Sequence, residues 1–369
     1  MTVQDRSSYS HVIITKFSYR GVEMSRSFAP LDPAVLSRRF DVFEATCLPS
    51  ILGQTCKNFS WVLLVDEMLP AAFRSRLQNL VSGHSSAFLH RYSINLRLHA
   101  LDWLVPYLGE SKDHVVTTML DDDDMLCADF VAGIQAHLHD MQARGGLPRV
   151  QLMACQNALQ WDMVAKRDAP LGYVKPWQAK APDGRYYHPP STGFSALSDY
   201  PDPNLSIFRF GHHLARFYFT DDETPVRMSE EAQKSKKART KSIRRATLTN
   251  GDVVPAEKAI LHWIRIPGDA PQALIINHGT NQQILRLFYN THKRVKIDGP
   301  ASLAGFPCDW AAVARCMERH PHRWSHLVRQ LRHVIWLKFS ISNPSSFTMR
   351  FGRAVTHSAT RLRDVVLPR

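Results

Sequence analysis

The sequence has little that would anchor it in a membrane or cross-link it covalently. No apolar run approaches the roughly 18 residues that a membrane-spanning helix needs. Residues 1–10 are polar and lack the apolar core of a secretory signal peptide. The six cysteines are scattered over 369 residues without a CxxC pair. We therefore expect a cytoplasmic protein whose cysteines are free thiols.

Several motifs of common enzyme classes are also missing. The chain contains no GxxxxGK(S/T), GxGxxG, HExxH or GxSxG sequence. These absences argue against P-loop nucleoside triphosphatases, dinucleotide enzymes, zinc proteases and α/β-hydrolases. The composition itself is ordinary for a globular protein, since 44% of the residues are hydrophobic and 21% are charged.

The positive charge is large and unevenly placed. The formal net charge of +13 indicates an anionic partner: nucleic acid, an anionic membrane surface or nucleotide phosphates. Basic residues gather in segment 229–245 and from residue 310 onward. The polar stretch 229–252 predicts an exposed basic loop. Segment 324–339 is amphipathic, basic and carries two tryptophans, so it either rests on an anionic bilayer or packs on the rest of the protein.

Apolar periodicity predicts an α/β protein. Short β-branched runs predict strands at 11–17, 61–66 and 114–120, and the ambiguous stretch 86–98 has room for another. Amphipathic patterns predict helices at 36–52, 70–81, 101–108 and 128–143. This alternating order predicts a mostly parallel sheet covered by helices. Beyond residue 149 we expect strands at 150–154, 158–166, 205–210 and 273–278, and then a basic helix at 310–340.

Four consecutive aspartates, Asp121 to Asp124, follow the strand predicted at 114–120. Such carboxylates repel one another, and a divalent cation would offset the repulsion. Mg2+ and Mn2+ prefer oxygen ligands and bind through one or two carboxylates together with substrate phosphates. In open α/β sheets, ligands bind beyond the carboxyl ends of the strands. The run therefore predicts a metal-assisted phosphate or diphosphate site.

The acidic run has four interpretations. One is an acidic turn that caps the helix beginning near Ala128. An EF-hand loop does not fit, because its sixth and twelfth positions would be Leu126 and Ala132 instead of Gly and Glu. A haloacid-dehalogenase-type phosphatase would use Asp121 as nucleophile, although its motif normally lies on the first strand. The remaining interpretation is the Asp-x-Asp motif of nucleotide-sugar glycosyltransferases.

A family resemblance favours this last interpretation. The first predicted strand, the Leu-Pro-Ser helix with its glutamine and the acidic run together resemble the family of bacterial rhamnosyltransferases with a GT-A-type fold. The resemblance is clear over residues 11–140 and fragmentary beyond them. It departs at Lys16 and Met119, where the family usually has arginine. The segments that carry it are Ile14–Arg20, Arg39-Phe40, Phe43-Glu44, Cys47–Ile51, Gln54-Thr55, Phe59–Trp61, Thr118–Asp124, Gly193–Ser195 and His278–Asn281.

The resemblance implies roles for particular residues. Asp121 would face the nucleotide ribose or the metal, and Asp123 would be the main metal ligand. His278 would complete the metal shell, or it is a packed histidine at a strand end. Asp66 and Arg20 would contact the donor, although a strand-end acid and a surface arginine are the plainer alternatives. Asp122 would be the most replaceable aspartate of the run.

The general base is left open by the sequence. An inverting transferase needs a group that takes the acceptor proton. The candidates are Asp124, Asp222 and Glu223, and an ordinary acidic turn at 221–223 is the alternative for the last two.

Together these observations predict a metal-dependent glycosyltransferase that uses Mn2+ or Mg2+, a nucleoside-diphosphate sugar (rhamnose among the candidates) and a glycan or lipid-linked acceptor. A GT-A-like domain would span residues 1–300, with a nucleotide-sugar half at 11–127 and an acceptor half at 128–300. A basic helical extension would follow at 301–369, available for peripheral contact with the inner face of a membrane. The alternatives are a phosphotransferase with Asp121 as nucleophile and a non-enzymatic basic module that binds RNA or membrane.

Overall fold

The computed structural model describes a mixed α/β protein and supports the fold class expected from the sequence. All structural statements here concern the described residues, which are 9–18, 31–93, 96–109, 113–155, 157–163, 169–177, 190–201, 205–209, 260–264, 270–278 and 295–319. Within them, no helix has both the length and the apolar character to cross a bilayer.

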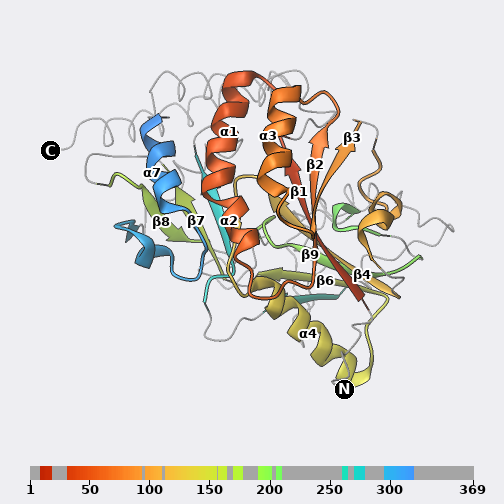
Figure 1. Ribbon diagram of the computed structural model, residues 1–369. Helices are drawn as coiled ribbons and strands as arrows, with labels where there is room; N and C mark the ends of the chain where they lie inside the picture. Colours follow the sequence, from red (N-terminus) through yellow and green to blue (C-terminus); the bar gives the residue numbers. More distant parts are fainter. Residues whose placement is uncertain are drawn as a thin grey trace, which may run out of the picture.

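The larger of two sheets has seven strands in the order β10-β6-β9-β4-β1-β2-β3 (Figure 1). The four strands β3, β2, β1 and β4 are parallel, as the alternating sequence pattern predicted. Strand β9 then runs antiparallel between β4 and β6. The strands are β1 (Tyr9–Phe17), β2 (Ser60–Asp66), β3 (Ala87–Tyr92), β4 (His114–Asp121), β6 (Val150–Cys155), β9 (Ser195–Asp199) and β10 (Ile260–Ile264).

A second sheet of five strands has the order β12-β8-β7-β11-β5. The chain enters it directly after the aspartates, because β5 begins at Met125. The short strand β5 pairs with the start of β11, so the acidic turn joins the two sheets. The strands are β5 (Met125–Leu126), β7 (Ala158–Asp162), β8 (Tyr173–Pro176), β11 (Ala273–Asn277) and β12 (Val295–Lys296).

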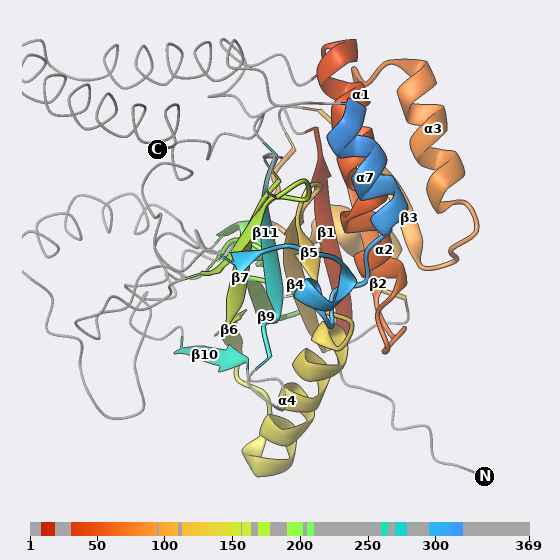
Figure 2. The same ribbon diagram turned by 90° about the vertical axis from the view of Figure 1, so that its left-hand side faces the viewer.

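Helices cover both sides of the main sheet. Figure 2 shows α1, α2, α3 and α7 on one side of β1. The core on this side includes edge-to-face contacts of Phe17 with Phe40 and Phe43, at centroid distances of 4.7 and 5.2 Å. Leu104 and Phe208, from η1 and η2, pack on the opposite side. The helices are α1 (Pro33–Ala45), α2 (Cys47–Leu52), α3 (Ala71–Val81), η1 (Asp102–Tyr107), α4 (Phe130–Gly145), η2 (Ile207–Arg209), η5 (Pro300–Leu303) and α7 (Trp310–Arg319).

Two expectations about secondary structure were wrong. The single helix expected at 36–52 is instead two helices, α1 and α2, separated at Thr46. The Thr46 hydroxyl donates to the Val42 carbonyl at 2.7 Å, and its backbone leaves the helical region. The strand expected at 205–210 is instead the 3-10 helix η2 at its described residues. Its β-branched and aromatic residues pack on the main sheet without joining it, so tertiary packing overrides the local pattern.

The Gln54 side chain connects the end of α2, the Leu-Pro-Ser helix, to the start of α4. Its buried amide donates to the carbonyls of Ser50, at 2.9 Å, and Cys127, at 2.7 Å. Its side-chain oxygen accepts from the backbone N–H of Val131 at 3.0 Å. This N–H belongs to the first turn of α4 and would otherwise lack a helical partner. One glutamine therefore ties α2 to the segment that follows the acidic run.

Gly193 precedes β9 where the chain passes close to β4. Its φ is +76°, and its N–H donates to the Met119 carbonyl at 2.9 Å. A Cβ atom there would lie 2.7 Å from Cys155 Sγ and 2.9 Å from a Phe130 ring carbon. Both the backbone conformation and the available space therefore require glycine.

The variant Gly193→Ala should lower the free energy of unfolding by about 2–5 kcal/mol, because it combines backbone strain with overpacking. Gly109→Ala is the matched control, since its φ is +72° but nothing lies within 4 Å of its Cβ position. We expect that variant to lose only about 1–2 kcal/mol. Urea denaturation of both proteins measures the difference, and equal losses would show that crowding at Gly193 is not limiting.

His11 lies buried between β1 and β4. Its Nε2 atom is 2.9 Å from the Thr118 hydroxyl. Burial lowers the pKa of the ring to about 3, so His11 stays neutral in the folded protein. In the unfolded chain an ordinary histidine takes up a proton below about pH 6.5. Stability is therefore lost as the pH falls from about 6.5 toward 3, because the unfolded state binds the extra proton.

Between pH 7.5 and pH 5, His11 should remove about 2 kcal/mol from the free energy of unfolding. The variant His11→Gln keeps a polar side chain that does not titrate. Over the same pH interval, its free energy of unfolding should therefore fall by about 2 kcal/mol less than that of the wild type. Urea denaturation at both pH values tests the prediction. Parallel pH profiles for the two proteins would contradict it.

Candidate functional site

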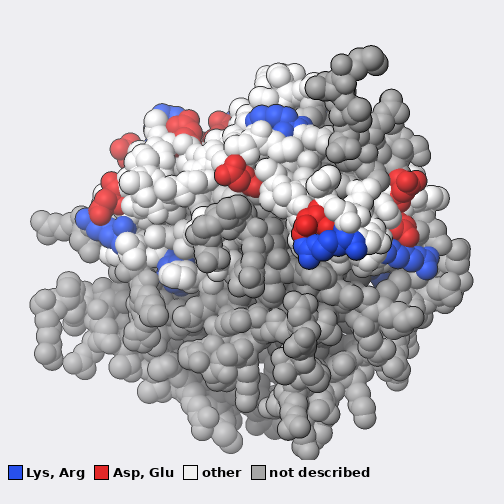
Figure 3. All heavy atoms as spheres, turned by 90° about the horizontal axis from the view of Figure 1, so that it is seen from below, with Lys and Arg blue, Asp and Glu red and all other residues white. Residues whose placement is uncertain are grey.

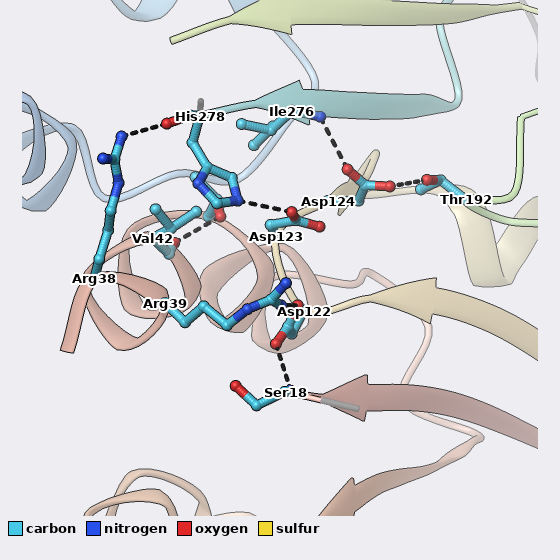
Figure 4. A network of polar contacts seen from close by, with 11 residues as sticks. Ser18, Arg38, Arg39, Val42, Asp122, Asp123, Asp124, Thr192, Ile276 and His278 are labelled. Atoms are coloured by element: carbon cyan, nitrogen blue, oxygen red, sulfur yellow. Dashed lines mark hydrogen bonds and ion pairs between the residues drawn. The ribbon is translucent and has the colours of Figure 1, made fainter. Parts of the chain in front are cut away.

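The four aspartates occupy the end of β4 and the turn into β5, at the carboxyl edge of the parallel strands. Three of them are buried, with Asp122 and Asp124 each 3% exposed and Asp123 8% exposed. Carboxylates are rarely buried unless they are paired. Each one must therefore be compensated by specific contacts, which Figure 4 shows from close by.

Asp122 is held by the first strand and the first helix. One of its oxygens accepts from the Ser18 backbone N–H at 2.8 Å, and the other forms an ion pair with the Arg39 guanidinium. Register explains the first contact, because Lys16 of β1 lies beside Asp121 of β4. The family resemblance makes Asp122 the most replaceable aspartate of the run. The buried ion pair favours a structural role for it, because removing either charge would leave the other buried without this partner.

Asp123 faces His278 at the end of β11. The His278 Nε2 atom lies 2.9 Å from Asp123 Oδ2, and the ring is 1% exposed. Arg38 of α1 donates to the His278 carbonyl. The two residues are 155 positions apart in the chain, and the pairing of β5 with β11 brings them together.

Asp124 has both carboxylate oxygens in use. One accepts from the Ile276 backbone N–H at 2.9 Å, and the other accepts from the Thr192 hydroxyl. These contacts connect the turn to β11 and to the segment before β9. They favour a structural role for Asp124 over the role of general base.

Asp121 is the most exposed of the four, with 38% of its side chain accessible. Among the described residues, it forms an ion pair with Lys16 Nζ, at 3.9 Å. Desolvation raises the pKa of Asp121, and the charges of Asp123 and Asp122 raise it further, against the effect of Lys16. This residual repulsion is what a bound cation would relieve.

The buried carboxylates differ in their ionisation. Burial and the charges of Asp123 and Asp121 raise the pKa of Asp124 well above its usual range. Burial also opposes ionisation of Asp123, but its hydrogen bond with His278 and the charge of Arg39 lower its pKa. Burial lowers the pKa of His278 and so disfavours the charged ring, whereas the hydrogen bond with Asp123 and its charge act in the opposite direction. For Nε2 to bind a cation, the ring must be neutral with its proton on Nδ1.

The other predicted site residues are only partly placed. Asp66 ends β2 with 2% exposure, and its carboxylate accepts from the Met68 backbone N–H at 2.8 Å. Arg20, Asp222 and Glu223 lie outside the described residues. Among the described residues, no three His, Cys, Asp or Glu side chains form a ready-made metal site. A cation held here would need further ligands from water or a substrate.

Two arginines organise the site, although the sequence had indicated a site role for neither of them. Arg38 and Arg39 are neighbours on α1 and reach different partners, the end of β11 and the acidic turn. Arg38 is 9% exposed and shares a buried face of α1 with Val42 and Ala45, four and seven residues further along the helix. An arginine within such a face is a signal of a buried acceptor, but it does not identify which one.

Charged side chains of both signs lie on the described part of the surface seen in Figure 3, where acidic and basic residues are interspersed. The basic segment 229–245 lies outside the described residues, as does most of the chain beyond residue 310. The predicted anion-binding and membrane-contacting surfaces therefore stay predictions.

Comparison with known proteins identifies one matching family, described as "Putative rhamnosyl transferase", over residues 10–241. No functionally curated protein matches the sequence. One similar solved structure is S. aureus TarS 1–349 in complex with UDP-GlcNAc, with 14% identity over 40% of this chain and a TM-score of 0.23. The match spans about a third of that chain, 34%. Another is the mannosyltransferase PcManGT from Pyrobaculum calidifontis in complex with GDP-Man and Mn2+, with 13% identity, 94% and 79% coverage of the two chains and a TM-score of 0.28.

The variant Arg39→Met should lower the free energy of unfolding by about 3–5 kcal/mol, because it leaves the Asp122 carboxylate buried without its cation. Arg76→Met is the matched control on α3, where the side chain is 39% exposed and pairs with Glu44 at 2.6 Å. That variant should lose no more than about 1 kcal/mol. Chemical denaturation distinguishes the two, and a small loss for Arg39→Met would mean that the ion pair contributes little.

Proposed function

Because this chain belongs to the family described as "Putative rhamnosyl transferase" and is a glycosyltransferase, we propose that it uses Mn2+ or Mg2+ to transfer a sugar from a nucleoside diphosphate. We propose rhamnose as the sugar and a glycan or lipid-linked glycan as the acceptor. The observation that carries the metal dependence is the buried Asp123–His278 pair at the carboxyl edge of the sheet.

The spacing of this pair fits a single cation. Two ligand atoms on adjacent positions of an octahedral ion, each about 2.1 Å from it, lie about 3 Å apart. The Asp123 Oδ2 and His278 Nε2 atoms are 2.9 Å apart. Asp123 is also the aspartate whose pKa is lowered, so it supplies the ionised oxygen that a hard cation prefers. Both ligand atoms therefore need little movement to bind the same ion.

A cation bound here would offset the negative charge that develops on the leaving diphosphate. The protein residues hold and orient the components. Arg39 fixes Asp122, and thereby the backbone that carries Asp123. Asp121, the exposed member of the run, is available to a nucleotide ribose or to the cation. Asp66, at the end of the neighbouring strand β2, and Arg20 are the proposed additional contacts for the donor.

If the reaction inverts the configuration at the anomeric carbon, the general base is proposed to lie outside the aspartate turn. Asp124 already accepts hydrogen bonds on both oxygens and is 3% exposed, so it is poorly placed to receive an acceptor proton. Asp222 and Glu223 are therefore the preferred candidates. We further propose a cytoplasmic location, with the basic segment beyond residue 310 in contact with an anionic membrane surface that carries the acceptor.

The test is to replace Asp123 with alanine and to measure divalent-dependent hydrolysis and transfer of nucleoside-diphosphate sugars. We expect kcat to fall by about 10²–10³-fold, because a group that stabilises the developing charge has been lost. Asp140→Ala is the control, since Asp140 lies on α4 with 54% of its side chain exposed. It should retain wild-type activity.

Two results would contradict the proposal. One is undiminished, divalent-dependent activity in Asp123→Ala, which would remove Asp123 from the site. The other is transfer by the wild-type protein at an unchanged rate after chelation of divalent ions, which would leave the transferase assignment standing without its metal.

A further inference from the structure

One face of the second sheet is apolar, whereas the other carries buried polar side chains beside apolar ones. Trp161, Leu274 and Ile276 belong to the core cluster that also contains residues of α1 and α7. Side chains of adjacent residues on a strand point to opposite faces. Asp162 and Asn277 therefore lie on the other face, yet they are only 2% and 0% exposed.

Four polar side chains on this face form a connected group, in which the Gln160 amide donates to Asp162 Oδ1 at 3.4 Å. The Asn277 amide donates to Asp162 Oδ1 at 2.8 Å. The Lys175 ammonium of β8 lies 3.8 Å from Asp162 Oδ2 and is 5% exposed. The backbone strengthens the connection, because the Met163 N–H donates to the Asn277 carbonyl at 2.9 Å. The end of β11 is therefore fastened to the end of β7 through both side chain and main chain.

Stability alone does not explain Asn277. Its Oδ1 atom is buried and has no hydrogen-bond partner among the described residues, so there only one half of the amide is satisfied. A buried polar atom without a partner is destabilising, and an apolar side chain of similar size would avoid this. Residues that break such a rule in folded proteins are found at functional sites.

Asn277 can act on the residue that follows it in the chain. His278 follows it directly, and the Asp123–His278 contact requires the last residues of β11 to be fixed. Three separate contacts fix them in addition to the backbone hydrogen bond from Met163. Asp124 accepts from the Ile276 N–H, Arg38 donates to the His278 carbonyl, and the Asn277 side chain is held by Asp162. The Asn277 contact is the one that acts from the side of the sheet opposite to α1.

We propose that Asn277, held by Asp162 and Lys175, is a positioning residue that sets the orientation of the His278 ring toward Asp123. The inference rests on the proposed function for its consequence, which is that the ring and the carboxylate are oriented to bind one cation. Groups behind a metal ligand commonly alter metal affinity by about 10–100-fold. Asn277 differs from them in acting through the backbone of the ligand residue.

The first experiment needs no metal. Ring ¹⁵N and ¹H signals of histidine-labelled protein are compared between the wild type and Asn277→Ala, with His278→Gln used to assign the His278 ring. We expect the His278 signals to shift and broaden, because the ring loses its single orientation. Gln160→Ala is the control, since it removes a buried amide that donates to the same Asp162 oxygen at the longer distance of 3.4 Å and leaves the Asn277–Asp162 hydrogen bond in place. It should leave the His278 signals in place.

The second experiment measures Mn2+ binding directly by electron paramagnetic resonance, without a sugar donor. Asn277→Ala should bind Mn2+ about 10-fold or more weakly than the wild type, and Gln160→Ala should bind it normally. Melting temperatures accompany each titration to establish that the variants are folded. If Asn277→Ala does not fold, Asn277→Leu fills the same space with an apolar side chain and is tested in its place.

The outcomes separate the two proposals. Unchanged His278 signals in a folded Asn277 variant would overturn the positioning role. Shifted signals with weakened Mn2+ binding would support both the role and the proposed metal site. Shifted signals in a protein whose wild type binds no Mn2+ would support positioning of the ring and overturn the metal-dependent function.

Discussion

The structure depends on the compensation of buried negative charge at one turn. Three carboxylates are buried at the end of β4, and each is satisfied by a different part of the chain. Asp122 binds Arg39 and the end of β1, Asp123 binds His278, and Asp124 binds β11 and Thr192. An uncompensated buried charge is strongly destabilising, so these contacts specify how α1, β1 and the second sheet meet.

This arrangement joins stability to function. The same contacts that make the turn tolerable in the folded protein also present Asp123 and His278 as a spaced pair. Asp121 is left partly exposed and only weakly neutralised by Lys16. The proposed metal-dependent transfer would benefit from this arrangement, because the Asp123–His278 pair is already in place and can stabilise developing charge without having to reorganise. The second sheet also contributes to this arrangement, because contacts at the end of β11 hold His278 in place.

Much of the fold could be predicted from the sequence. Alternation of apolar strands and amphipathic helices over residues 11–143 predicted the parallel half, and the acidic run was correctly expected at the carboxyl end of one of its strands. The break at Thr46 and the 3-10 conformation of Ile207–Arg209 could not be predicted, because a side-chain hydrogen bond and tertiary packing override local propensity there. Strand β9 was missed as well, although its antiparallel insertion places Thr192 and Gly193 beside the turn.

By itself, the sequence determined that four adjacent carboxylates must follow a buried strand, because apolar runs and charges are properties of local composition. It also placed His278 at the end of a later strand. Only the tertiary structure decided which aspartate has which partner. Those pairings join residues separated by 83 positions for Arg39 and Asp122 and by 155 for His278 and Asp123. Such contacts follow from strand order and register, which depend on packing of the whole chain and leave no local signature.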